Sequence, residues 1–405
     1  MSRKLWWAYL LAALTGIGPL ASAQAPADAG PGPVQRIVVF RPGMPQAKAI
    51  RLLQESGAKI VQELHLINAV AVEFPPAAFQ DAEMNLASSQ DIVRVDKNTK
   101  RKWIESAPAT VEGVQLPSIE SIIKPFTPRA RQAALPWGIT RVNAGKAWTL
   151  TKGAGVKVAV IDTGIDYNHP TLKPNIKGGF NAVDQSKSDD FMDDNGHGTH
   201  VAGTIAGAGD ARGVSGVAPE AALYGVKVLD AEGSGTVAGV IAGIQWAADN
   251  HMDVANMSLG SDESDQSLAD AVAAAAKAGL TIIAAAGNSS GPVGYPAAYP
   301  ECIAVSASDK TDKLASFSSF GPQVAIIAPG VNILSTYMGG GYKTLSGTSM
   351  ATPHVTGLAA LAVAAKGARG TDAIRAALQA AASPLAGLSP VQQGAGLVDA
   401  AKLVR

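Results

Sequence analysis

The chain has 405 residues, of which 47% are hydrophobic, and a formal net charge of zero. This length and apolar content suffice for a sizeable core in roughly two or three domains, and they are not typical of a fibrous or disordered chain. The zero net charge gives no overall field that would recruit nucleic acid or an anionic membrane, so we expect neither as a partner. A single cysteine, Cys302, excludes an intramolecular disulfide framework and a multi-cysteine zinc site.

The N-terminus carries the pattern of a secretory signal peptide, which we predict over residues 1–23. Arg3 and Lys4 precede an apolar run at 5–20, and small residues at 21–23 supply a cleavage site. We therefore expect a secreted protein, either extracellular or periplasmic. The apolar run is shorter than the ~20 residues that a membrane-spanning helix needs. Retention of the segment as an uncleaved anchor stays open.

Residues 24–33 form a linker rich in Pro, Gly and Ala, and a compact unit is predicted over 34–105. The patterns follow the order strand, helix, strand, strand, helix, strand, which is typical of a ferredoxin-like unit with two helices on one antiparallel sheet. The predicted strands cover 35–40, 58–64, 68–74 and 91–98, and the predicted helices cover 46–57 and 76–89. The next residues, 106–133, are irregular, which indicates an exposed linker that contains a processing site.

The pattern changes over 134–405, where continuous apolar strands alternate with helices. Such alternation predicts an α/β domain with a mostly parallel sheet covered by helices on both faces. Sites in such sheets form just beyond the carboxyl ends of strands, where this chain places its polar residues. The predicted strands include 156–162, 222–230, 253–260 and 280–288, and the predicted helices include 237–251 and 267–279.

The first polar motif is 158-VAVIDTGID-166, in which a buried strand ends at Asp162. A carboxylate at that point is costly unless it has hydrogen-bond or positively charged partners. Asp162 is therefore either a catalytic carboxylate or a turn or helix-cap aspartate, and this motif alone does not decide between them.

The second motif, 195-NGHGTHVAGTIAGA-208, places His197 between two glycines at the start of a predicted helix. His200 follows one helical turn later, and two histidines at that spacing can bind zinc. The motif lacks the HExxH pattern and an evident third ligand, so we favour a catalytic His197.

The third motif, 346-SGTSMATPHVTGLAALAVAAK-366, opens a predicted buried helix with Gly347-Thr348-Ser349. Ser349 is either a helix cap or a nucleophile. A nucleophile at a helix start gains the unpaired N–H groups and positive dipole end, which stabilise an oxyanion.

The chain resembles the subtilisin-like serine proteases over about residues 134–402. The resemblance rests on VAVIDTGID, HGTHVAGT, NMSLG, AAAGN and GTSMATPHV, and on the chain order Asp, His, Ser. The unit at 34–105 is similar to the propeptide of secreted subtilisins, which in that family acts as an intramolecular chaperone and temporary inhibitor. The resemblance thus implies a secreted, broad-specificity serine endopeptidase that is made as a self-processing zymogen.

The resemblance also assigns catalytic roles. It implies that Ser349 attacks the scissile carbonyl, that His197 transfers the proton, and that Asp162 orients His197 and stabilises its charged form. Asn288 matches the family's side-chain donor to the oxyanion, with the Ser349 N–H as the second donor.

The family binds substrate partly by strand addition to exposed strand edges. Two sets of residues match these edges: Gly233, Ser234 and Gly235, and Ser258, Leu259 and Gly260. The primary specificity pocket is expected between the second set and Ala285, Ala286, Gly287 and Asn288, with Gly294 near its floor. None of these residues is charged, so we expect cleavage after medium or large apolar residues.

An acidic loop at 184–194 precedes His197 and suits a hard, oxygen-ligated cation. We expect a structural calcium ion there, with ligands from Asp184, Asp189, Asp190 and Asp193. A solvated acidic loop is the alternative. The expected partners are polypeptide substrates and the chain's own propeptide, and we expect a monomer. Two other functions stay open: a catalytically silent binding protein with this fold, and a tethered maturation protease of narrow specificity.

Overall fold

The computed structural model describes residues 33–104, 135–209 and 214–405. The predicted signal peptide and the predicted linker at 106–133 lie outside these ranges, as does most of the linker at 24–33. Within the ranges described, we find no helix with the length and hydropathy needed to span a bilayer.

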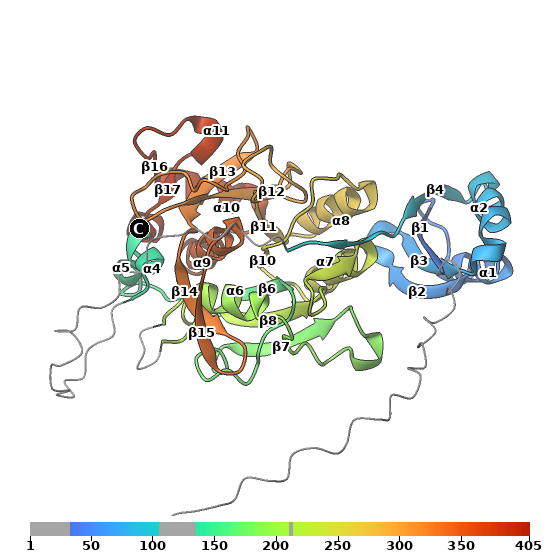
Figure 1. Cartoon of the computed structure of the whole chain (residues 1–405), viewed down its shortest axis with the longest axis horizontal. Coiled ribbons are helices and arrows are strands. Elements are labelled where there is room, and N and C mark those ends of the chain that lie inside the picture. The colour runs from blue at the N-terminus through green and yellow to red at the C-terminus, as the bar shows by residue number, and fades with distance from the viewer. Residues whose placement is uncertain (1–32, 105–134, 210–213) are drawn as a thin grey trace, which may run out of the picture.

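The N-terminal unit is a four-stranded antiparallel sheet with the strand order β2-β3-β1-β4. Its strands carry apolar residues on both faces. One face packs on α1 and α2, whereas the other contributes Ile37, Val39 and Ala71 to a core shared with α7 and α8 (Figure 1). The sequence predicted this order of strands and helices. The elements are β1 (Val34–Phe40), α1 (Gln46–Glu55), β2 (Lys59–Leu64), η1 (His65–Ile67), β3 (Ala69–Phe74), η2 (Pro76–Ala78), α2 (Phe79–Ser88) and β4 (Ile92–Lys97).

The larger part of the molecule is built on a nine-stranded sheet with the order β16-β17-β13-β12-β11-β10-β6-β8-β7. Neighbouring strands are parallel except β16 and β17, and the central strands are buried, which explains their continuous apolar sequences. The predicted α/β class is thus confirmed. The strands are β6 (Lys157–Asp162), β7 (Ile176–Asn181), β8 (Ala222–Lys227), β10 (Val254–Met257), β11 (Thr281–Ala285), β12 (Cys302–Ser308), β13 (Val324–Pro329), β16 (Ala382–Ser383) and β17 (Leu397–Val398).

Helices cover both faces of this sheet. On one face α7 and α8 share a core with the N-terminal unit, and on the other α6, α9, α10 and α12 form a second core (Figure 1). The helices are α4 (Trp137–Arg141), α5 (Ala144–Ala147), α6 (His197–Ala206), α7 (Val237–Asp249), α8 (Gln266–Lys277), α9 (Thr348–Lys366), α10 (Thr371–Ala381), α11 (Pro390–Gln393) and α12 (Ala400–Leu403), with η3 at Gln185–Lys187. A hairpin of β14 (Ile333–Tyr337) and β15 (Gly341–Leu345) precedes α9, and β5 (Lys100–Lys102) pairs with β9 (Ser234–Thr236).

Candidate active site

The polar motifs lie at the carboxyl edge of three neighbouring strands. Asp162 ends β6, Ser258 follows β10, and Asn288 follows β11, and these strands are adjacent in the order β11-β10-β6. Two helices begin at the same motifs, α6 at His197 and α9 at Thr348. Residues that are distant in sequence are therefore gathered because parallel strands end at a common edge.

Asp162 and His197 form a buried hydrogen-bonded pair. His197 Nδ1 donates to Asp162, with distances of 2.8 Å to Oδ1 and 3.0 Å to Oδ2, and the Asp162 side chain has no exposed surface. Burial of the ring would lower the pKa of His197. The charge and hydrogen bond of Asp162 and the charge of Asp193 outweigh burial, so the pKa is raised. With Nδ1–H directed at Asp162, the neutral ring presents Nε2 as the basic nitrogen.

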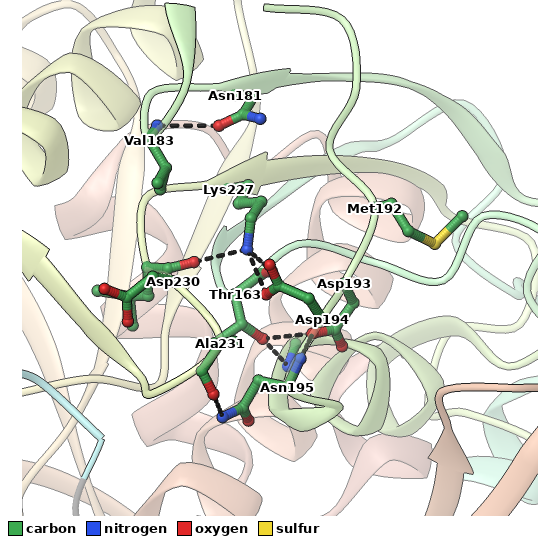
Figure 2. Close-up of polar contacts among 12 residues, drawn as sticks. Thr163, Asn181, Val183, Met192, Asp193, Asp194, Asn195, Lys227, Asp230 and Ala231 are labelled. Carbon is green, nitrogen blue, oxygen red and sulfur yellow. Dashed lines mark hydrogen bonds and ion pairs between the residues drawn. The ribbon is translucent and has the colours of Figure 1, made fainter. Parts of the chain in front are cut away.

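Asp193 ties the end of β6 to the start of α6, as Figure 2 shows in part. Its buried carboxylate accepts from Thr163 Oγ1 at 2.8 Å and from both the N–H and the hydroxyl of Thr199. It also accepts from the N–H groups of Asn195 and Gly196. These five donors fix the loop that carries His197 relative to the strand that carries Asp162.

Lys227, at the end of β8, holds the same loop from the other side (Figure 2). Its nearly buried ammonium donates to the carbonyls of Thr163 and Leu229 and to Asp194 Oδ1 at 2.7–2.8 Å. All three donors of the ammonium therefore have acceptors, which is the condition under which a buried charge is tolerated.

Ser349 occupies the second position of α9, and its hydroxyl donates to Ser258 O at 3.1 Å. Among the described residues we find no hydrogen bond from Ser349 Oγ to His197. Pro353 lacks the N–H that would bond the Ser349 carbonyl, and that carbonyl instead accepts from Ser258 Oγ at 2.8 Å. Two reciprocal hydrogen bonds therefore lock the start of α9 to the end of β10.

Two nitrogen atoms that carry N–H groups lie close to the place that a side chain at Gly347 would take. A Cβ atom built on Gly347 would lie 3.6 Å from Ser349 N and 3.7 Å from Asn288 Nδ2. Asn288 Oδ1 accepts from the N–H and the hydroxyl of Thr348, which orients the amide. Gly347 has a φ of 155°, which side chains rarely adopt. A side chain at position 347 would thus be strained and would fill the place where an oxyanion could meet both donors.

The other two histidines near the site are buried and neutral. Burial lowers the pKa of His200 to about 3 and that of His354 to about 4. His200 Nε2 contacts the carbonyls of Ile333 and Lys343, so it donates, and His354 Nδ1 lies 2.9 Å from Met350 O. The zinc alternative finds no support, since the described ranges contain no group of three or more His, Cys, Asp or Glu that could hold a metal.

The segment that follows β4 occupies the predicted substrate edges. Here β5 pairs antiparallel with Ser234–Thr236, and Trp103 N donates to Gly233 O at 3.0 Å. On the other side, Gly260 N donates to Trp103 O at 2.9 Å. Residues 100–104, which we call the tail, therefore lie as an added strand in the cleft between the two edges. The structure thus brings both predicted edge sets together.

Trp103 is almost fully buried and is the largest side chain that the tail places in the cleft. Its indole N–H donates to Gly235 O at 2.9 Å, so the ring is buried without an unpaired donor. Full burial of a large apolar side chain contributes about 1.5–3 kcal/mol, which makes Trp103 the main anchor of the tail.

A pocket adjoins this anchor and reaches Ser349. It is lined by several of the predicted pocket residues: Leu259, Gly260, Ala285, Gly287, Asn288 and Gly294. Ser258 and Ala286 are instead fully buried behind it. The lining also includes Ser261, Asp262 and Thr348, which the sequence reasoning missed. The expectation of a wholly uncharged pocket therefore needs correction at Asp262, which stands directly after the predicted edge.

The acidic loop does not gather its carboxylates. Asp184 caps η3 by accepting from Ser186, and Asp190 accepts from Tyr167 and from the Met192 N–H. Within the described ranges, Asp189 accepts a hydrogen bond from Ser188 Oγ alone, at 3.4 Å, and Asp193 is buried with the five donors described above. These carboxylates do not fit a common calcium ion, because each meets different protein groups and they form no metal-ligand cluster in the described residues.

Comparison with known proteins places the chain in a family. Residues 153–396 match the model of the subtilase family, and the chain belongs to that family. It is a serine endopeptidase of the subtilisin type, as the sequence predicted.

Three relatives illustrate the likeness. An alkaline protease of Shouchella clausii is 46% identical over 306 residues, which cover 75% of this chain and 78% of the relative. Subtilisin Savinase of Lederbergia lenta is 49% identical over 275 residues, 67% of this chain and 99% of the relative. Subtilisin E of Bacillus subtilis is 39% identical over 372 residues, 89% of this chain and 88% of the relative.

Proposed function

We propose that the chain is a secreted zymogen whose mature form hydrolyses polypeptides through Ser349, His197 and Asp162. The hydrogen bond from His197 Nδ1 to the buried Asp162, beside the two donors that face Gly347, carries this proposal. The proposal keeps the predicted boundaries: a signal peptide at 1–23, a linker at 24–33, a propeptide at 34–105, a linker with the processing site at 106–133 and a catalytic domain at 134–405.

The chemistry follows from the positions of these groups. The Ser349 hydroxyl turns from Ser258 O toward His197 Nε2, since catalytic hydrogen bonds often tighten only when substrate binds. Ser349 Oγ attacks the scissile carbonyl and His197 Nε2 takes the proton, and the resulting imidazolium is stabilised by Asp162. The oxyanion accepts from Ser349 N–H and Asn288 Nδ2. His197 then protonates the leaving amine. In the second half of the reaction, His197 takes a proton from the water that attacks the acyl carbon, and it returns this proton to Ser349 Oγ as the acid product leaves.

The tail at residues 100–104 supports the zymogen proposal. It fills the strand-addition site from Gly233 to Gly235 and contacts Gly260, so a substrate backbone cannot bind there at the same time. Further contacts anchor the unit: Asn98 Oδ1 accepts from Ala238 N at the start of α7, and Ser267 Oγ donates to Asp96 at the start of α8. Cleavage after the tail would leave it as an inhibitor that must dissociate or be degraded.

The specificity proposed for the pocket beside Ser349 is for apolar side chains, with Asp262 at its edge. A structural calcium ion stays a prediction from the family resemblance, and the four loop carboxylates do not form the group that would hold it. We also keep the expectation of a monomer.

The deciding experiment compares the full chain with Ser349→Ala. We expect the wild type to cut its own linker and to hydrolyse an unfolded protein, and we expect the variant to remain at full length and inert. A silent binding protein would behave identically in both forms, even after another protease nicks the linker, and that result would overturn the proposal.

A further inference from the structure

The cleft continues beyond the Trp103 site into a charged region. Two loops flank the tail there: one between β8 and β9 carries Asp230, and one between β10 and α8 carries Glu263 and Asp265. We call these three carboxylates the acidic rim. The rim faces the tail residues that precede Trp103. The sequence analysis predicted an uncharged pocket and did not identify these carboxylates.

The tail presents its basic residues to the rim in strand alternation. Successive side chains of a strand point to opposite faces. Lys100 Nζ lies 2.8 Å from Asp230 Oδ2, whereas Arg101 points to the other loop, 3.9 Å from both Glu263 and Asp265. Lys102, in the same run, forms no ion pair with a described residue.

Arg101 is the more strongly held of the two basic residues. Its side chain is 14% exposed, and its Nη1 donates to Ser261 Oγ at 3.0 Å. Its guanidinium also lies 5.2 Å from the centre of the Trp103 ring, so the cation and the aromatic anchor are bound as one unit. Lys100, by contrast, is 63% exposed, and exposed ion pairs contribute little.

Within the rim, Asp265 gains most from a cation, because its side chain is 12% exposed whereas that of Glu263 is 80% exposed. Burial raises the pKa of Asp265, and the Leu268 N–H and the charge of Arg101 act against that rise. Asp265 also caps α8 through Leu268 N, which fixes its position before any ligand arrives. A guanidinium at this point therefore relieves the cost of a partly buried carboxylate.

We infer that the acidic rim selects polypeptides that carry arginine or lysine two and three positions before the side chain that fills the Trp103 site. This inference rests on the proposed function, and it assigns the occupant from the tail that already lies in the cleft. Preferred substrates would thus combine a basic pair with an aromatic anchor, in addition to an apolar residue in the pocket beside Ser349.

The test uses the processed enzyme obtained from the full chain and an unfolded protein as the reporter substrate. Peptides of residues 98–105 compete with the reporter, and their competition constants are measured for the parent sequence and for Lys100→Gln, Arg101→Gln and Lys102→Gln. Each change removes one positive charge, so Lys102→Gln is the matched control. We expect competition to weaken about 3- to 10-fold for Arg101→Gln and roughly 2-fold for Lys100→Gln, with Lys102→Gln close to the parent.

Variants of the enzyme are then measured with the same peptides. In a Glu263→Gln/Asp265→Asn double variant, Asn keeps the oxygen that caps α8. We expect the ratio between the competition constants of the parent peptide and the Arg101→Gln peptide to fall toward 1, because the two carboxylate partners of the guanidinium have lost their charge while the contacts with Ser261 and Trp103 remain. Asp249→Asn removes a carboxylate outside the rim, at the end of α7, which in the full chain contacts His65, and this variant should leave the ratio intact.

The outcomes distinguish failure of the proposed selectivity from failure of the proposed protease function. Equal competition by all four peptides, or an unchanged ratio in the double variant, would overturn the selectivity and leave the protease function standing. Failure of the processed enzyme to hydrolyse the reporter would overturn the proposed function, and the selectivity with it.

Discussion

Two polar regions stand out in the sequence: the motifs of Asp162, His197 and Ser349, which we call the strand-end cluster, and the acidic loop at 184–194. The structure brings the first set together and leaves the second dispersed. Asp162, His197 and Ser349 come from three separate motifs and converge at one edge of the sheet. The carboxylates of the acidic loop are neighbours in sequence and yet face different partners. Convergence imposed by the topology of a parallel sheet is therefore a better guide to a site than local density of charge.

Asp193 shows the contrast within one residue. It belongs to the acidic loop by sequence, whereas its contacts join it to the strand-end cluster, since it accepts from Thr163 after β6 and from Thr199 in α6. Its charge also helps to raise the pKa of His197. The following predictions test how far the cluster and the loop differ, from the largest expected effect to the smallest.

The largest effect should come from Asp162→Asn. The amide would favour the wrong tautomer of His197, and the equivalent change in a Ser-His-Asp triad lowers kcat about 10⁴-fold. We expect a loss of similar size, measured on a peptide substrate with KM little changed. Asp166→Asn is the matched control, because Asp166 is also buried beyond β6 but accepts from the loop at Gly339 and Gly340. Equal losses in both variants would remove Asp162 from its catalytic role.

The second effect concerns the donors that face Gly347. Asn288→Ala removes an N–H that would act on the oxyanion and not on the ground-state carbonyl, so kcat should fall while KM changes little. Subtilisin supplies the measured example, and we take its loss of about 10²–10³-fold in kcat as the expected size. A variant that raised KM and kept kcat would instead place Asn288 in substrate binding.

A smaller effect is expected from Asp193→Asn, in the pH profile. His197 must be neutral to act as a base, so kcat/KM rises as pH increases through its raised pKa. The charge of Asp193 is one cause of the raised pKa of His197, so its removal should lower that pKa. The acidic limb of the profile should therefore move to lower pH.

Asp194→Asn provides the comparison for that measurement, since Asp194 is half exposed and pairs with Lys227. If both variants lost activity by the same factor at every pH, Asp193 would be a structural residue only.

The raised pKa of His197 also has a consequence for stability. A group whose pKa is higher in the folded state contributes stability below its unfolded pKa, and this contribution is lost as pH rises through the folded pKa. The Asp162–His197 pair therefore stabilises the fold most in mildly acidic solution.

The smallest effect should come from the loop itself. Asp189→Ala removes a carboxylate whose one contact among the described residues is the Ser188 hydroxyl, so unfolding free energy should change by less than about 0.5 kcal/mol. Calcium should shift the Tm of wild type and variant equally. A calcium-induced shift that disappeared in Asp189→Ala would restore the loop as a metal site.

Much of this molecule was accessible to sequence reasoning because the signals are local. The order of strands and helices in the N-terminal unit follows from periodicity, and so do the buried strands that end at Asp162 and before Asn288. The motifs predicted that His197, Ser349 and Gly347 stand at the starts of two helices, and α6 and α9 begin there in the structure.

What the sequence could not determine depends on non-local contacts. Arg101 and Glu263 are 162 positions apart, and no local pattern joins them. The burial of Trp103, the charged edge of the pocket at Asp262 and the hydrogen bond from Thr163 to Asp193 likewise appear only when separate segments pack together. The sequence thus determined the chemistry, because reactive residue types stand in characteristic local motifs. Tertiary structure alone decided which carboxylates serve that chemistry and what lies in the cleft, because burial and pairing depend on the neighbours that folding supplies.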